Sequence, residues 1–266
     1  MKQKHVSAIE VVKESFSYLL QRLWLMKYFW VTAVGGLLMA HQGMGNYAMD
    51  GLISSASVIA SILGAALYVG LIRSVLGKER MSWAMVVAQY SKGYFWRMVG
   101  TLILLAFLLL IGFAPLMILV YGLLETGGEM THMTMLVTVA GIFVSLAYLM
   151  FIGVIGNIAL THAAGGGHHS IRSAYRLIKS RAVRYFGGLV VASLPMGVLS
   201  TLMTHFYAVI HQKAVADGWL MGNLESLSDP LVLVMGLLYL VVVFWYAFFS
   251  LFPTIYAAKF YMELTK

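Results

Sequence analysis

The chain contains no cysteine, which excludes disulfide bonds, thiolate metal sites and cysteine nucleophiles. It is also poor in charge: Asp, Glu, Lys and Arg make up 11% of its 266 residues, whereas apolar residues make up 61%. So few charges cannot cover the surface of a soluble domain of this length, so we expect lipid to solvate much of the chain. The composition therefore predicts an integral membrane protein.

Six apolar runs are long enough to cross about 30 Å of hydrocarbon at about 1.5 Å per residue. They cover residues 24–40, 52–72, 98–124, 133–161, 186–210 and 231–258. Because the runs are continuously apolar and lack the two-residue alternation of barrel strands, they predict helices. We expect an all-α polytopic membrane protein with six transmembrane helices, forming one integral membrane domain over residues 1–266. Pro115, Pro195 and Pro253 should kink the third, fifth and sixth spans.

Positive charge sorts to one side of these spans. Of the 18 Lys and Arg residues, only Lys213 falls in a segment on the other side. Since cytoplasmic flanks retain Lys and Arg during membrane insertion, this distribution predicts that both termini are cytoplasmic. The net charge of +8 arises beside the spans, where it meets anionic lipid, and does not indicate nucleic-acid binding.

Three segments on the cytoplasmic side, residues 6–23, 81–97 and 169–185, resemble one another. Each opens with a serine in N-cap position and leads into an odd-numbered span; these serines are Ser7, Ser82 and Ser170. We interpret the segments as amphipathic interfacial helices, each followed by a two-span hairpin, which gives approximate units 6–72, 81–161 and 169–258. The alternative is that long inner loops of any membrane protein contain amphipathic stretches.

Two of these segments have a clear division between an apolar and a polar face. In the first, the apolar face consists of Ile9, Val12, Phe16, Leu19 and Leu23. In the third, the basic stripe of Arg172, Arg176 and Lys179 lies opposite Ile171, Ala174, Tyr175 and Ile178.

The glycine-rich sequence Gly165-Gly166-Gly167-His168-His169-Ser170 precedes the third segment. A helix N-terminus beside glycines can receive a phosphate, and basic side chains that follow can pair with it. Ser170, Arg172, Arg176 and Lys179 are therefore candidates for binding an anionic lipid headgroup. The alternative is a flexible turn from the fourth span onto the membrane surface. A nucleotide P-loop is excluded, because no Gly-Lys-Ser/Thr follows the glycines.

Two stretches carry a family resemblance: Gly-Lys-Glu-Arg-Met-Ser-Trp at 77–83 and His-Ser-Ile-Arg-Ser-Ala-Tyr-Arg-Leu at 169–177. They resemble the YciC-type family of bacterial inner-membrane proteins and the membrane domain of some glycerophosphodiester phosphodiesterases. The resemblance implies a six-span protein of helix-plus-hairpin units in the bacterial cytoplasmic (inner) membrane. It implies no assigned activity and carries over no catalytic residue.

Methionine and histidine gather on the predicted outer face. Candidate metal ligands are His41, the cluster of Met130, His132, Met133 and Met135, and His205. Thioether and imidazole ligands together suit copper, particularly Cu(I). The alternative is packing, because methionine fills membrane helices and histidine suits interfaces. We expect no cofactor, and copper is the alternative that these candidate ligands leave open.

Other chemistry is sparse. No Ser-His-Asp order, paired buried carboxylates or HExxH motif is present, so we expect no enzymatic activity. The span interiors are nearly free of Asp, Glu, Lys and Arg, which argues against a proton-driven carrier. Asn157, His162 and His205 come closest to a relay, and hydrogen bonding between helices is the alternative for Asn157 and His205.

The sequence therefore favours a non-enzymatic inner-membrane protein that binds lipid or a protein partner in the membrane and supports transport or envelope maintenance. Its lipid partners would be anionic headgroups on the cytoplasmic face. The alternative is a copper permease or metal-handling membrane subunit. A third hypothesis is the substrate-binding membrane subunit of a transporter that is powered by another protein.

Overall fold

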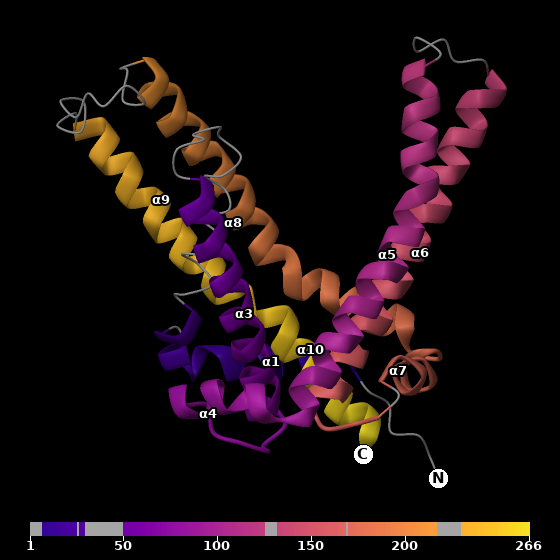
Figure 1. The fold of residues 1–266 in the computed structure, drawn as a ribbon, viewed down its shortest axis with the longest axis vertical. Coiled ribbons are helices and arrows are strands. Elements are labelled where there is room, and N and C mark those ends of the chain that lie inside the picture. The colour runs from indigo at the N-terminus through magenta and orange to yellow at the C-terminus, as the bar shows by residue number, and fades with distance from the viewer. Residues whose placement is uncertain (1–6, 26, 30–49, 126–131, 169, 217–229) are drawn as a thin grey trace. The chain divides into compact units, whose positions relative to one another are not determined.

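The computed structural model describes residues 7–25, 27–29, 50–125, 132–168, 170–216 and 230–266. Within these ranges all regular structure is helical, and no strand occurs. The all-α prediction is therefore confirmed for the described part of the chain. Figure 1 shows how the helices follow one another along the chain.

The helices fall into long apolar ones and short ones that connect them. The long helices are α3 (Asp50–Val75), α5 (Gly93–Glu125), α6 (His132–Ala164), α8 (Ala182–Ala216) and α9 (Pro230–Phe249). The shorter elements are α1 (Ala8–Leu20), η1 (Leu23–Leu25), α4 (Trp83–Ala88), η2 (Gln89–Ser91), α7 (Ser170–Ile178) and α10 (Leu251–Thr265).

Among the described residues, four helical stretches are long and apolar enough to cross a membrane: Gly93–Ala114, Thr138–Ala164, Ala182–Phe206 and Gly236–Thr265. They correspond to the third to sixth predicted spans. The predicted span 52–72 lies in α3, where Ile62–Val75 forms a shorter apolar helix. Most of the predicted span 24–40 lies outside the described residues. The described chain therefore has the helices of a multi-pass membrane protein.

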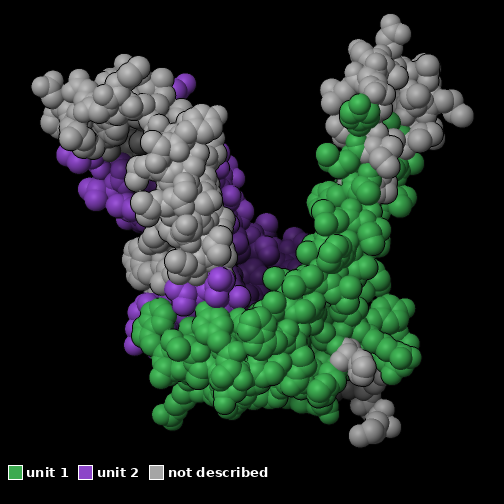
Figure 2. All heavy atoms as spheres, in the orientation of Figure 1, with its two compact units in different colours: residues 1–8, 69–187, 257–266 green, residues 9–68, 188–256 purple. Residues whose placement is uncertain are grey.

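The chain divides into two compact units (Figure 2). Unit 1 comprises residues 1–8, 69–187 and 257–266, and unit 2 comprises residues 9–68 and 188–256. Unit 1 therefore contains α4, α5, α6 and α7, and unit 2 contains η1, α9 and most of α1. The three repeat units inferred from the sequence remain a prediction.

In unit 1, α5 and α6 run side by side as a helical hairpin (Figure 1). Glycine permits the close approach: a Cβ on Gly112 of α5 would lie 2.4 Å from the ring of Tyr148 on α6. Elsewhere in the same helix pair, a Cβ on Gly156 of α6 would lie 3.2 Å from the Leu105 side chain of α5. The Tyr148 hydroxyl donates a hydrogen bond to the carbonyl of Leu108 at 3.2 Å. Small residues at such positions let two helix backbones pack tightly in lipid.

In unit 2, α1 buries only part of the face that its apolar pattern marks. Val11, Ser15, Tyr18 and Leu19 are buried, whereas Ile9 is 69% exposed. Phe16 and Leu23 are also exposed; the Phe16 ring still contacts Phe249 and Phe252, with centroids 6.4 and 5.6 Å away. The helix therefore has a protein-facing side, a polar side and an exposed apolar side between them. Periodicity alone does not separate side chains that face protein from those that face lipid.

The sixth predicted span divides into α9 and α10 at Ser250. Pro253 explains the break, because it has no N–H to donate to the carbonyl of Phe249 and its ring clashes with that carbonyl. The Ser250 hydroxyl donates to the carbonyl of Ala247 at 2.6 Å and satisfies one carbonyl at the end of α9. Pro115 and Pro195 lie inside α5 and α8 without ending either helix.

Candidate functional site

Two helices, α3 and α6, end within unit 1, and both ends have the same type of cap. At the end of α3, Gly77 has a φ of 69° and its N–H bonds the carbonyl of Ser74 at 3.2 Å. At the end of α6, Gly166 has a φ of 96°. Its N–H donates to the carbonyl of Ala163 at 3.0 Å, and the N–H of Gly167 donates to the carbonyl of His162 at 2.9 Å. These paired bonds form Schellman motifs, which favour glycine at the left-handed position. Helix capping therefore accounts for the central glycine of the triplet.

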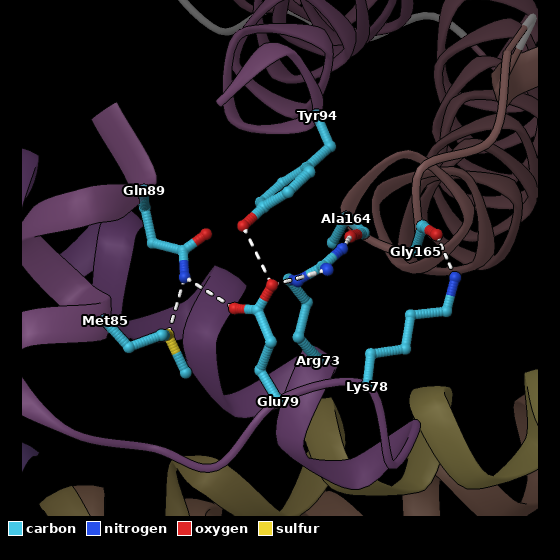
Figure 3. Close-up of polar contacts among 8 residues, drawn as sticks. All are labelled: Arg73, Lys78, Glu79, Met85, Gln89, Tyr94, Ala164 and Gly165. Carbon is cyan, nitrogen blue, oxygen red and sulfur yellow. Dashed lines mark hydrogen bonds and ion pairs between the residues drawn. The ribbon is translucent and has the colours of Figure 1, made fainter. Parts of the chain in front are cut away.

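Three basic side chains meet the carbonyls exposed at the end of α6. Arg73 donates to the carbonyl of Ala164 at 3.0 Å, and Arg97 donates to that of Gly166 at 2.8 Å. Lys78 donates to the carbonyl of Gly165 (Figure 3). Positive charge is stabilising at a helix C-terminus, where the carbonyls carry partial negative charge. Arg73 and Arg97 entered the sequence analysis only as basic residues on the cytoplasmic side, and Lys78 also as part of the stretch 77–83.

Arg73 is the centre of a polar cluster that joins the loop after α3 to η2 and α5 (Figure 3). Its guanidinium forms an ion pair with Glu79 at 2.6 Å and lies 3.8 Å from the ring centre of Tyr94. The Glu79 oxygen that pairs with Arg73 also accepts a hydrogen bond from the Tyr94 hydroxyl at 3.3 Å. The second Glu79 oxygen accepts a hydrogen bond from the Gln89 side chain at 3.3 Å. The Arg73 side chain is 11% exposed and that of Glu79 30%.

The surroundings of Glu79 favour its charged form. Burial by itself raises the pKa of the carboxyl, but the hydrogen bond and positive charge of Arg73 outweigh it, helped by hydrogen bonds from Gln89 and Tyr94. The pKa therefore lies below the ordinary value. Since the polar groups of the cluster bond mainly one another, we interpret it as a structural junction.

A pocket of about 390 Å³ opens between α5 and α7, and Arg97 is one of the residues that line it. Arg97 and Arg172 line it together with Ser170 and Thr101. The Thr101 and Ser170 hydroxyls lie 2.7 Å apart, and Thr101 also donates to the carbonyl of Arg97 at 2.7 Å. Ser170 is the first residue of α7, so its hydroxyl joins α7 to α5.

Three further residues form an apolar part of the pocket wall. They are Gly100 and Leu104 of α5 and Ile171 of α7. Gly100 is exposed, and a Cβ placed on it would meet no atom within 4 Å. The pocket therefore combines two guanidinium groups and hydroxyls with an apolar surface.

The structure brings two of the four predicted headgroup residues into this pocket, namely Ser170 and Arg172. Arg176 of α7 and Lys179, which directly follows α7, are exposed and do not line it. The predicted apolar face of α7 is confirmed in part: Ala174 and Ile178 are fully buried, whereas Tyr175 is exposed. Among the described residues, the side chains of the basic stripe form no hydrogen bond or ion pair.

Sequence reasoning missed the contribution of α5 to the pocket. Arg97, Gly100, Thr101 and Leu104 follow an i, i+3, i+4, i+7 spacing, which places them on one face of a helix. That spacing is a usable signal for a shared face. It does not show that this face meets α7, because the contact joins residues far apart in the chain.

Of the predicted metal ligands, only His205 has a side chain among the described residues. His41 and Met130 lie outside the described residues, as do the side chains of His132, Met133 and Met135 at the start of α6. His205 is exposed on α8. Among the described residues no group of three or more histidine or carboxylate side chains is placed to hold a metal ion. The copper site remains a prediction.

The polar residues within the predicted spans have local partners. The Asn157 side chain donates to the carbonyl of Gly153 at 3.0 Å, one turn back in its own helix. His162 joins two helices, because its Nδ1 lies 2.8 Å from the hydroxyl of Tyr261 in α10. Its Nε2 lies 3.2 Å from the carbonyl oxygen of His168.

Comparison with known proteins identifies no relative of this chain. No protein-family model matches the chain, and no curated protein or solved structure matches it. The resemblance to the YciC-type family therefore depends on the segments 77–83 and 169–177 alone.

Proposed function

We propose that this chain is a non-enzymatic, multi-pass protein of the bacterial inner membrane that binds anionic lipid through the basic stripe of α7, Arg172, Arg176 and Lys179. One observation carries the proposal. The helix buries Ala174 and Ile178 completely and leaves the whole stripe exposed, without partners among the described residues. An amphipathic helix with basic residues on its outer face suits a membrane surface that carries negative charge.

The proposed topology has six spans with both termini in the cytoplasm. The distribution of Lys and Arg supports it, because all but Lys213 of the 18 lie on one side. The short helices support an interfacial position, since each exposes a large apolar side chain: Ile9 (69%), Trp83 (44%) and Tyr175 (46%). In this topology α1, α4 and α7 lie at the cytoplasmic surface, where aromatic residues favour the headgroup region.

The three short helices, the basic inner surface and the lack of catalytic motifs support a role in envelope maintenance or in support of transport as part of this proposal. A protein partner within the membrane is part of this proposal. The large exposed apolar faces of α5 and α6 are available to lipid or to such a partner.

The strength expected for the basic stripe follows from its charge. A basic residue near an anionic surface contributes about 1 kcal/mol, so three contribute about 3 kcal/mol. That energy corresponds to roughly a 100-fold preference for anionic over zwitterionic lipid at low salt. The preference should weaken as salt rises, because the stripe is exposed.

Competition between spin-labelled phosphatidylglycerol and phosphatidylcholine around the purified full-length protein tests the proposal. We expect a variant with Arg172→Gln, Arg176→Gln and Lys179→Gln to lose most of the preference for phosphatidylglycerol. The matched control carries Lys13→Gln, Arg80→Gln and Lys92→Gln, which remove the same charge from exposed positions elsewhere. Equal losses in the two variants, or no preference in the unmodified protein, would contradict the proposal. Reporter fusions at both termini test the topology.

A further inference from the structure

We propose that the pocket between α5 and α7 binds a single phospholipid, with its phosphate at Arg97 and Arg172 and its apolar part along Leu104 and Ile171. This inference rests on the proposed function and narrows it. The basic stripe attracts anionic lipid in general, whereas the pocket holds one molecule in a defined place.

The charged part of the pocket suits a phosphate. Arg97 and Arg172 line it together, and no acidic residue does. The Nη1 of Arg97 donates to the carbonyls of Gly166 and Gly167 and lies beside the His168 ring, and its Nε donates to the carbonyl of Gly93, while its Nη2 bonds no described residue. The guanidinium of Arg172 likewise has no partner among the described residues. A guanidinium presents several N–H donors in a plane and bonds phosphate oxygens in pairs. An anion between the two arginines would offset the repulsion of their charges.

The position of the pocket along α5 suits a lipid. Leu104 follows Arg97 by seven residues, so the lining extends about 10 Å along the helix axis. Trp96, beside Arg97, is 60% exposed, and its indole donates to the carbonyl of Tyr90 at 2.9 Å. Exposed tryptophan marks the headgroup level of a membrane helix. Leu104 is 51% exposed and lies toward the apolar middle of α5, at the depth of acyl chains.

The apolar wall distinguishes a lipid from a free phosphate ion. A small anion would occupy the arginine end and leave Leu104, Ile171 and Gly100 uncovered. A phospholipid covers both parts, because its glycerol and first acyl carbons continue from the phosphate over about the same distance as the pocket lining.

Gly100 offers a way to block the pocket without changing its charge. No atom lies within 4 Å of the place where its Cβ would be, so Gly100→Leu projects a side chain into open space beside the pocket. Leucine also favours a helix more than glycine does, so the variant should fold. Gly197 on α8 is the matched control, because it is exposed and equally free of neighbours.

The test uses the full chain in phosphatidylcholine nanodiscs with increasing phosphatidylglycerol, and native mass spectrometry to count retained phosphatidylglycerol molecules. We expect one tightly retained molecule in the unmodified protein and in Gly197→Leu. In Gly100→Leu and in Arg172→Gln its retention should weaken at least tenfold. Unchanged retention in Gly100→Leu would overturn the pocket proposal.

Two further arms separate the possible outcomes. Soluble glycerol phosphate should not displace the retained lipid at comparable concentration; if it does, the phosphate alone is the ligand and the apolar part of the proposal is wrong. If the unmodified protein prefers phosphatidylglycerol in the spin-label competition but Gly100→Leu retains it normally, the proposed function stands and the pocket proposal fails. If the unmodified protein shows no preference, both fail.

Discussion

Replacing Arg73 with methionine should destabilise unit 1. The change removes the ion pair to Glu79, the bond to the carbonyl of Ala164 and the contact with the ring of Tyr94. A hydrogen bond to a charged group contributes about 1.5–3 kcal/mol, and breaking a fully buried ion pair costs about 3–5 kcal/mol. Because the Glu79 side chain is 30% exposed and gains some hydration, we expect about 2–4 kcal/mol.

Denaturant titration of the protein in mild detergent, followed by tryptophan fluorescence, measures this loss. Arg80→Met is the matched control, since Arg80 is exposed in the same loop, and it should cost less than about 0.5 kcal/mol. The double variant Arg73→Met with Glu79→Gln should be more stable than Arg73→Met alone, because no unpaired carboxylate is left. The reasoning is refuted if Arg73→Met costs no more than Arg80→Met.

The same ion pair predicts a pH dependence. The pKa of Glu79 in the folded protein lies below the ordinary value of 4.5, so the folded state favours the carboxylate. The resulting stability is fully present above pH 4.5 and is lost as the pH falls through the lower, folded-state pKa. The stability difference between the unmodified protein and Glu79→Gln should therefore shrink below about pH 4.5. A difference that is constant across this range would show that the charge of Glu79 contributes nothing.

Three more predictions concern backbone caps and helix packing. Ser82→Ala should cost about 1 kcal/mol, because the Ser82 hydroxyl accepts from the N–H of Met85, and amide exchange in α4 should accelerate. Gly166→Ala should cost about 1–2 kcal/mol in thermal unfolding, since its φ of 96° is unfavourable for alanine, whereas Gly187→Ala should be neutral or stabilising. Gly112→Ala should cost about 1–3 kcal/mol, because its methyl group would lie 2.4 Å from Tyr148; a smaller cost in a Tyr148→Ala background confirms that cause.

Local patterns predicted most of the helices and some of their ends. The apolar runs matched α5, α6, α8 and the pair α9 and α10, because a chain in lipid must bond its backbone groups within each helix. Pro253 was expected to disturb the last span, and the break between α9 and α10 lies at Ser250. The serine that caps α4 was also identified correctly, since Ser82 accepts the bond from Met85.

Periodicity was less informative about which side of a helix meets protein. In α7 the pattern was right for Ala174 and Ile178, which are buried opposite the basic face, but Tyr175 of the same apolar face is exposed. In α1 the apolar face marked by Ile9 is exposed, and the side that contains Val11 and Ser15 is buried. Apolar side chains in a membrane protein face either protein or lipid, and both environments favour the same residue types.

The sequence by itself determined that the described chain is helical, where four of its apolar spans lie, and that α7 has a basic face opposite Ala174 and Ile178, because each property depends on neighbours within a few turns of one helix. Only the tertiary structure decided that Arg73 caps a helix 91 residues away and that Thr101 meets Ser170, 69 residues along the chain. Helical geometry sets which residues share a face, but the depth and angle at which two helices pack set which faces meet. The pocket that joins Arg97 to Arg172 therefore became visible only once α5, α6 and α7 were packed together.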